Sequence, residues 1–209
     1  MKKPEDVKKL EVTSPAFKDR GAIPSEYTCE GQETSVPLAW SKVPAGTRSV
    51  AVLVEDPDAV GGNFTHWLIV GIPPNVKKLD KGAAPPKGAV VAKNDKGMTG
   101  YAGPCPPTGK HDYHFHVYAL DIPLDRSLSK AELNAAIEGH VLAEGDLVGT
   151  YQKKDDPGMP KEEPKEEGTS PPPSPGEPHK GAQGQEPQPL PPQPSPQPSP
   201  PMPDGTGRG

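Results

Sequence analysis

The chain has 209 residues, of which 31% are apolar and 32 are proline, and its formal net charge is −5. Residues 154–209 carry five basic and nine acidic residues, a charge of −4, which leaves −1 for residues 1–153. A near-neutral domain has no basic stripe that could neutralise a nucleic-acid backbone, so we expect no nucleic-acid partner.

Composition divides the chain into two parts. Residues 154–209 hold 18 of the 32 prolines and only four apolar residues, Met159, Ala182, Leu190 and Met202. Such a segment cannot bury a core, so we predict a disordered, Pro-rich, low-complexity tail that serves as a spacer rather than as a ligand for an aromatic-lined groove. Residues 1–153 hold every aromatic residue and both cysteines, and we predict that they form one domain.

The chain begins with lysines but continues into no apolar segment, and no run approaches the length of a membrane span. We therefore expect a cytoplasmic protein. In chain order, residues 10–13 and 16–17 predict a first edge strand. Residues 24–41 predict a strand edge with long loops, because Pro37 interrupts the alternation of apolar residues there.

Residues 49–55 and 67–72 are rich in β-branched residues and predict two buried strands. Residues 73–103 are dominated by Pro, Gly and Lys, so we expect a long loop with one strand at 89–92. Residues 113–122 give the clearest alternation. We expect Tyr113 and the following odd-numbered residues on one face, and His114, His116, Tyr118 and Leu120 on the other.

Ser129 and Glu132 form a capping-box pattern that predicts the start of a helix. The apolar residues that follow suggest that it continues past Glu138 and His140 to Gly145, with a short last strand at 147–151. Many strands and one late helix indicate a mainly β, antiparallel domain.

Two loops carry the residues that could form a binding or catalytic site. Residues 56–67 connect the two buried strands and include Asp56, Asp58 and His66, with Pro57 favouring an extended Asp56 at the end of its strand. Asp-Pro-Asp and Gly-Gly-Asn are also ordinary turn sequences, and for this loop alone that reading is the more frequent one. A second Pro/Gly-rich loop, residues 100–113, delivers His111 and Tyr113 to the start of a strand. Two such loops could meet at one sheet edge and form a site.

These loops resemble those of the phosphatidylethanolamine-binding protein (PEBP) family, in particular its bacterial and archaeal branch, often called Raf kinase inhibitor-like. The similarity covers roughly residues 12–151 and includes segments 23–31, 37–40, 43–47, 56–58, 66–67, 103–107, 138–144 and 149–151. It implies a fold of two antiparallel β-sheets with a C-terminal helix. Two positions depart from the family pattern: Val60 stands where Pro is usual, and Asp112 stands where Arg is usual.

The resemblance also implies a pocket for a phosphate-bearing head group or another small anion. The ligand-binding residues that it implies are Asp56, Asp58, His66, Trp67, Gly103, Pro104, His111 and Tyr113. Imidazoles and hydroxyls donate hydrogen bonds to phosphoryl oxygens, whereas carboxylates only accept them. Asp56 and Asp58 are therefore expected to orient a histidine or to receive a hydroxyl or ammonium group of the ligand.

The resemblance further places Cys29 and Cys105 near the same edge, as a disulfide or as neighbouring thiols. It implies a protein target as well, a kinase or protease that the domain inhibits or regulates, and it leaves a homodimer open.

Two alternatives use the same histidines. His111, His114 and His116 could ligate a metal, although no cysteine or acidic residue in register completes the set. Asp56 or His66 could serve as the base of a hydrolase, but the chain has no Gly-x-Ser-x-Gly elbow and no phosphate-cradling loop. We therefore expect a binding protein that is not an enzyme and that needs no cofactor or metal.

Overall fold

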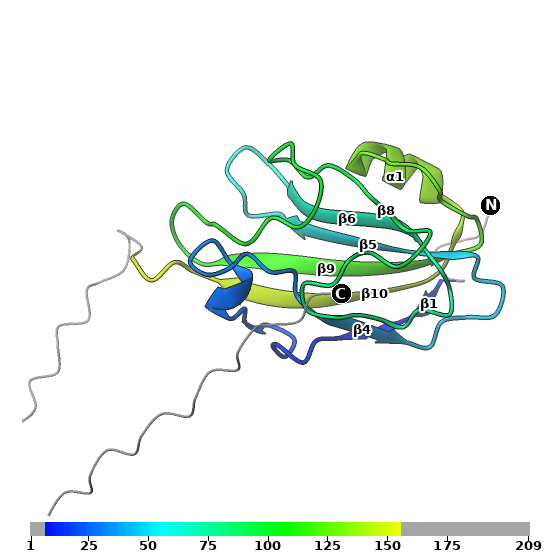
Figure 1. Cartoon of the computed structure of the whole chain (residues 1–209), viewed down its shortest axis with the longest axis horizontal. Coiled ribbons are helices and arrows are strands. Elements are labelled where there is room, and N and C mark those ends of the chain that lie inside the picture. Colours follow the sequence, from blue (N-terminus) through cyan, green and yellow to red (C-terminus); the bar gives the residue numbers. More distant parts are fainter. Residues whose placement is uncertain (1–6, 156–209) are drawn as a thin grey trace, which may run out of the picture. The chain divides into compact units, whose positions relative to one another are not determined.

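The computed structural model describes residues 7–155, which form a seven-stranded sheet and a three-stranded sheet (Figure 1). The strand order of the large sheet is β1 (Lys8–Lys9), β10 (Val141–Tyr151), β9 (His111–Leu120), β5 (Ser49–Asp56), β6 (Phe64–Ile72) and β8 (Val90–Val91), with β3 (Gly21–Ala22) pairing in parallel with β10. The small sheet contains β2 (Glu11–Thr13), β4 (Leu38–Ser41) and β7 (Lys78–Leu79). A 3₁₀ turn, η2 (Ser25–Tyr27), and a helix, α1 (Lys130–Ile137), complete the elements. The expected mainly β architecture of two sheets with one late helix is confirmed.

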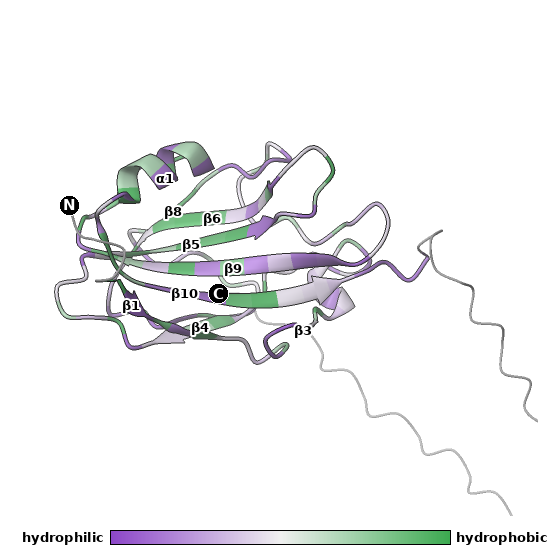
Figure 2. Ribbon diagram, turned by 180° about the vertical axis from the view of Figure 1, so that it is seen from behind, coloured by the Kyte–Doolittle hydropathy of each residue, from purple (hydrophilic) through white to green (hydrophobic). Residues whose placement is uncertain are grey.

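The part of the large sheet formed by β5 and β6 is buried on both faces, which explains the continuous apolar runs of these two strands. Residues such as Val52, Val54 and Phe115 pack on the face toward the small sheet, with Leu38 and Trp40. Ala51, Leu53 and Leu68 face the other way and pack against Leu133 and Ile137 of α1. Figure 2 shows that β5 is hydrophobic over most of its length and hydrophilic at its end, where Asp56 lies.

The helix ends earlier than the sequence predicts. The capping box is present, because the Ser129 hydroxyl accepts from the Glu132 amide while the Glu132 carboxylate accepts from the Ser129 amide. However, the helix stops at Ile137, and Gly139 adopts a φ of +75°, which turns the chain back toward the sheet.

Residues 141–145, which we predicted to be helical, belong instead to β10. This strand has 11 residues and pairs antiparallel with β9 over its length, so the strand expected at 147–151 is present but begins six residues earlier. The apolar residues at 141–143 are compatible with the periodicity of a helix or of a strand. Cross-strand pairing decides between the two and overrides any local preference for a helix. Glu138 and His140 therefore lie in the turn between α1 and β10.

Smaller differences concern the edges. The predicted first strand is divided into β1, which pairs with β10, and β2, which pairs with β4, so the chain crosses between sheets at the buried Leu10. Residues 16–17 are in no strand, and the strand predicted at 89–92 is only Val90–Val91. Within residues 7–155 no helix has the length and apolarity needed to span a membrane. The predicted tail, apart from Lys154 and Asp155, lies outside the described residues.

Candidate functional site

A pocket of about 320 Å³ opens at the edge where β5 ends and β6 and β9 begin. Both predicted loops contribute to it. The lining residues are Asp56, Ala59, Val60, Phe64, His66, Lys96, Cys105, Pro106, Pro107, His111 and Tyr113. Four of the predicted site residues, Asp56, His66, His111 and Tyr113, are therefore brought together, and each is at least nine-tenths buried.

A β-bulge directs His66 into this pocket. Val54 pairs with Trp67 and Glu55 pairs with Thr65, so His66 is an extra residue on β6 that has no single partner on β5. Trp67 packs in the core between the sheets, and strict alternation would send His66 to the opposite face. The bulge instead lets both residues face the same side, and bulges commonly re-aim side chains in this way next to functional sites.

The two oxygens of the Asp56 carboxylate make different contacts. Oδ1 accepts from the backbone amide of Asp58 at 2.8 Å, which is the turn contact expected of an Asp at the start of a loop. Oδ2 lies 2.8 Å from Nδ1 of His111, and because a carboxylate only accepts, Nδ1 is the protonated nitrogen. Asp56 thus shapes its loop and also orients the His111 ring, with Nε2 left for other contacts.

His66 is held by the backbone. Its Nδ1 donates to the carbonyl of Ala102 at 2.8 Å, which again leaves Nε2 as the second ring atom. Burial lowers the pKa of His66 below its ordinary value, although the Ala102 carbonyl and the Asp56 carboxylate oppose this effect. The ring is therefore neutral at pH 7, and its Nε2 is a hydrogen-bond acceptor until it gains a proton.

Tyr113 supplies a buried hydroxyl donor. Its side chain is fully buried, and its hydroxyl makes no well-formed hydrogen bond within the described residues, although the Asp56 carboxylate lies close enough to interact with it. The ring meets His66 edge-on at 5.2 Å and stacks at 6.4 Å on His111. Burial, followed by the nearby Asp56 carboxylate, raises the pKa of Tyr113, so the hydroxyl stays protonated. Leaving such a group unpaired costs about 1–3 kcal/mol, which a ligand oxygen would recover.

The rim adds one cation and several apolar groups. Lys96 reaches the pocket while forming an ion pair with Glu33 at 3.3 Å. Val60, at one of the two positions that depart from the family pattern, lies at the rim and is 87% exposed. Phe64 and the two prolines of the second loop make the remaining wall apolar, which strengthens any hydrogen bond formed inside. Sequence reasoning missed Phe64, Lys96 and these prolines, because nothing in a single sequence shows which loop residues face inward.

The other four predicted residues do not line the pocket. Asp58 is exposed, and its carboxylate accepts from the backbone amide of Asp112, which ties the first loop to the start of β9. Trp67 packs in the core, edge-on to Tyr101. Gly103 and Pro104 are buried behind the wall, and the Pro104 carbonyl accepts from the Cys29 amide at 3.1 Å.

Cys29 and Cys105 form a disulfide, with Cα atoms 5.3 Å apart and a sequence separation of 76. Cys105 also lines the pocket, so the bond fixes one wall to the 3₁₀ segment around Tyr27. A Cβ on Gly103 would lie 2.9 Å from the Tyr27 carbonyl oxygen, which shows how closely the second loop approaches that segment.

A second polar cluster lies on the opposite face of the sheet. His114 and His116 of β9 contact Asp146 of β10, and Glu55 of β5 lies beside them. Burial raises the pKa of Glu55, but hydrogen bonds from His116 and Lys130 outweigh this effect and lower it to about 2. The structure corrects our metal hypothesis in two respects. His111 faces the other pocket, and an acidic residue does lie in register, since Asp146 pairs directly with His116.

Residues 13–152 match the family described as phosphatidylethanolamine-binding protein. The chain is 46% identical over 144 residues to a UPF0098 protein of Methanothermobacter thermautotrophicus, a match that covers 66% of this chain and 95% of the relative. A UPF0098 protein of Chlamydia muridarum is 40% identical over 151 residues, covering 69% and 99%.

Two solved structures share the fold. A PEBP homologue of Chlamydia trachomatis superposes with a TM-score of 0.66 at 39% identity, covering 69% of this chain and 98% of that protein. YbcL of E. coli, described as a member of the mammalian PEBP family, gives a TM-score of 0.64 at 37% identity, covering 70% and 99%. The fold and the sequence together define a PEBP-like β domain. The chain belongs to the phosphatidylethanolamine-binding protein family.

Proposed function

We propose that this protein binds a small phosphate-bearing or other anionic molecule, such as a phospholipid head group, in the pocket between Asp56 and Tyr113. The observation that carries the proposal is the Tyr113 hydroxyl, a buried donor that makes no well-formed hydrogen bond and belongs to a residue lining the cavity. Native structures rarely leave such groups unpaired, and a functional role is one of the few explanations.

The neighbouring groups suit an anion that carries its own proton or whose binding is accompanied by protonation of His66. His66, His111 and Tyr113 line the cavity, the Nδ1 contacts of both histidines leave their Nε2 atoms for a ligand, and Lys96 adds positive charge at the rim. Because the pKa of His66 is lowered, this ring donates to an anion only once it is protonated. Binding should therefore take up a proton at neutral pH and strengthen as the pH falls, levelling off once the pH is below the lowered pKa of His66 in the free protein.

We further propose that the site binds rather than catalyses. A nucleophilic enzyme would need a serine, threonine or cysteine thiol beside the Asp56–His111 pair, and Cys105, the one such residue that lines the pocket, is held in the disulfide. A hydrolase in which His66 or Asp56 activates water remains the alternative. As part of this proposal, the protein inhibits or regulates a kinase or protease through the exposed rim around Val60, as in a Raf kinase inhibitor-like protein. We also propose a cytoplasmic location.

Calorimetric titration with O-phosphorylethanolamine tests the proposal. We expect saturable binding that weakens by about 1–3 kcal/mol in His66→Ala, His111→Ala and Tyr113→Phe, each of which removes a hydrogen-bonding group. Tyr118→Phe and His140→Ala are matched controls, because Tyr118 stands on the opposite face of β9 and His140 pairs with Asp121.

The same titration separates the two functions. A ligand that is recovered intact supports binding, whereas release of inorganic phosphate that disappears in His66→Ala supports the hydrolase. Equal affinity in the pocket variants and in the two controls would show that the ligand binds elsewhere.

A further inference from the structure

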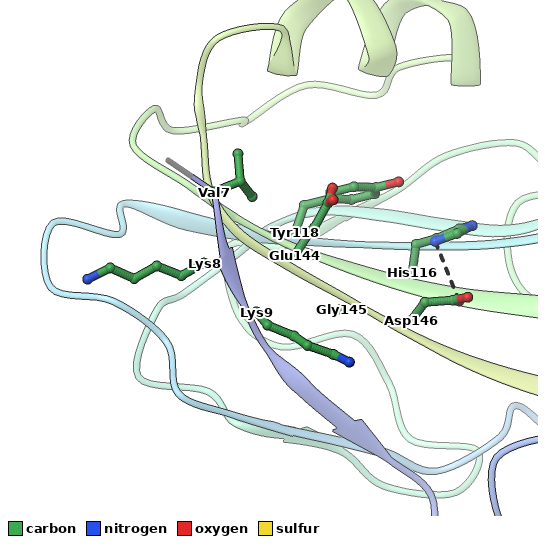
Figure 3. A pocket seen from close by; sticks show the side chains of 8 residues that line it. All are labelled: Val7, Lys8, Lys9, His116, Tyr118, Glu144, Gly145 and Asp146. Atoms are coloured by element: carbon green, nitrogen blue, oxygen red, sulfur yellow. Dashed lines mark ion pairs between the residues drawn. The ribbon is translucent and has the colours of Figure 1, made fainter. Parts of the chain in front are cut away.

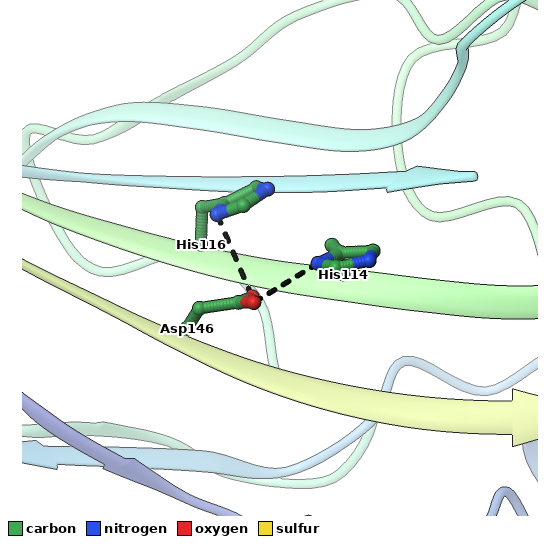
Figure 4. A group of neighbouring side chains, drawn as sticks. All are labelled: His114, His116 and Asp146. Atoms are coloured by element: carbon green, nitrogen blue, oxygen red, sulfur yellow. Dashed lines mark hydrogen bonds and ion pairs between the residues drawn. The ribbon is translucent and has the colours of Figure 1, made fainter. Parts of the chain in front are cut away.

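The face of the large sheet opposite the pocket carries a compact group of metal-ligating side chains (Figure 4). His114 and His116 are two residues apart on β9 and therefore point to the same side. Asp146 stands directly across from His116 on β10. Nδ1 of His114 lies 2.9 Å from Oδ2 of Asp146, and Nδ1 of His116 lies 3.5 Å from Oδ1, so both rings direct the same nitrogen toward one carboxylate.

We propose that His114, His116 and Asp146 bind a divalent transition-metal ion, for which Zn²⁺ is the simplest probe. One ligand atom from each residue lies within 4.8 Å of the other two. A tetrahedral ion with bonds of about 2.0–2.2 Å separates its ligands by about 3.3–3.6 Å. The three side chains are 29%, 23% and 36% exposed, so small rotations can close this difference.

The ligand set is chemically suited to such an ion. Two imidazole nitrogens and one carboxylate oxygen form the protein part of many zinc and non-haem iron sites, in which further positions stay open. In the metal-free protein Nδ1 of His114 is hydrogen-bonded to Asp146, and Nδ1 of His116 lies near the same carboxylate. Coordination through Nδ1 requires each ring to carry its proton on Nε2, so that Nδ1 presents a lone pair to the ion.

A further carboxylate is in place to orient one of the rings. Nε2 of His116, the nitrogen that faces away from Asp146, lies 3.4 Å from Oε1 of Glu55. Metal-ligating histidines almost always donate their second ring N–H to such a group. Glu55 is itself fixed by an ion pair with Lys130 of α1, and the His116 ring stacks between His114 and Tyr118.

The surroundings leave room for exchangeable ligands. A pocket of about 490 Å³ opens beside His116 and Asp146 and is bordered by Lys9 of β1 and by Tyr118 (Figure 3). The remaining coordination positions of the ion would face this space and hold water or a small anion. This site is separate from the anion pocket, because His111 and Tyr113 lie on the other face of β9.

The test is metal titration of the full, untagged chain by calorimetry, with Zn²⁺ and then Co²⁺, whose visible absorption reports the coordination directly. We expect one ion per chain. Loss of an outer-shell partner alone typically weakens metal sites by about 10- to 100-fold, so His114→Ala, His116→Ala and the near-isosteric Asp146→Asn should each weaken binding by at least about 100-fold. Mg²⁺ should not compete, because it prefers oxygen ligands.

The matched control is His140→Ala, which removes a histidine that is also paired with a carboxylate, Asp121, at 2.9 Å but has no second histidine beside it. It should bind like the unmodified protein, as should His111→Ala. Thermal unfolding of the metal-free variants checks that each is folded, and His116→Gln provides a second, size-conserving variant. The proposal is overturned if Zn²⁺ does not bind, if it binds equally well to the folded His114→Ala and His116→Ala variants, or if His111→Ala abolishes binding instead.

Discussion

The Cys29–Cys105 disulfide should account for a large share of the stability of the domain. It closes a loop with a sequence separation of 76 residues. In the chain-entropy description, a loop of this length restricts the unfolded chain by about 4.5 kcal/mol at 25 °C. Native contacts hold the same two segments together without the bond, since the Tyr101 hydroxyl donates to the Tyr27 carbonyl and the Cys29 amide to Pro104. Removing the bond should therefore act mainly on the unfolded state.

The perturbation is the double variant Cys29→Ser, Cys105→Ser, unfolded in guanidinium chloride beside the oxidised and the reduced unmodified protein. We expect the variant and the reduced protein to lose about 3–5 kcal/mol of unfolding free energy relative to the oxidised protein. For the 149 residues from 7 to 155, an unfolding entropy of about 2.1 cal/mol/K per residue converts this loss into a decrease in Tm of about 10–15 °C.

Reductant added to the double variant is the control and should change nothing. Mass spectrometry of the non-reduced protein establishes that the bond is present in the oxidised sample. Equal unfolding free energies for a verified oxidised protein and the double variant would refute the entropic argument.

Three further predictions concern single side chains. Tyr113→Phe should leave stability unchanged or raise it by about 1–2 kcal/mol in denaturant unfolding, because it removes an unpaired buried hydroxyl, and a clear loss of stability would contradict this. The lowered pKa of His66 means that the folded state loses stability as pH falls below the unfolded value of about 6.5, so His66→Gln should flatten the stability profile below that pH. The Glu55 pKa of about 2 contributes stability that is complete above pH 4.5 and is lost as pH falls toward 2. Because Glu55 is partly solvated, Glu55→Gln should cost only about 1–2 kcal/mol at pH 7 and less at pH 3.

The strands that build the pocket could be predicted because their patterns are local. Alternation in residues 111–120 places Tyr113 and His114 on opposite faces, and the structure agrees. Asp56 ends its strand as Pro57 suggests. The two readings of the Asp-Pro-Asp loop, ordinary turn or site, prove compatible, because one oxygen of Asp56 makes the turn and the other contacts His111.

The features that we failed to predict depend on pairing between strands that are distant in the sequence. The bulge that turns His66 inward is a mismatch between β5 and β6, and neither strand alone reveals it. Asp146 was missed for a similar reason. Because we assigned residues 141–145 to a helix, we did not expect this part of β10 beside β9. We therefore did not identify Asp146 as the cross-strand partner of His116.

Strand β9 therefore organises two sites through one backbone. His111 and Tyr113 face the proposed anion pocket, while His114 and His116 face the proposed metal site. A shift of one residue in register would move the side chains of each site to the opposite face of the sheet. The register of β9 must therefore be strongly specified. The apolar residues Phe115 and Val117 lie in the core between the sheets, and pairing with β5 and β10 on both sides holds the strand in place. Because the two faces share this rigid strand but no side chain, a substitution on one face should leave binding on the other unchanged.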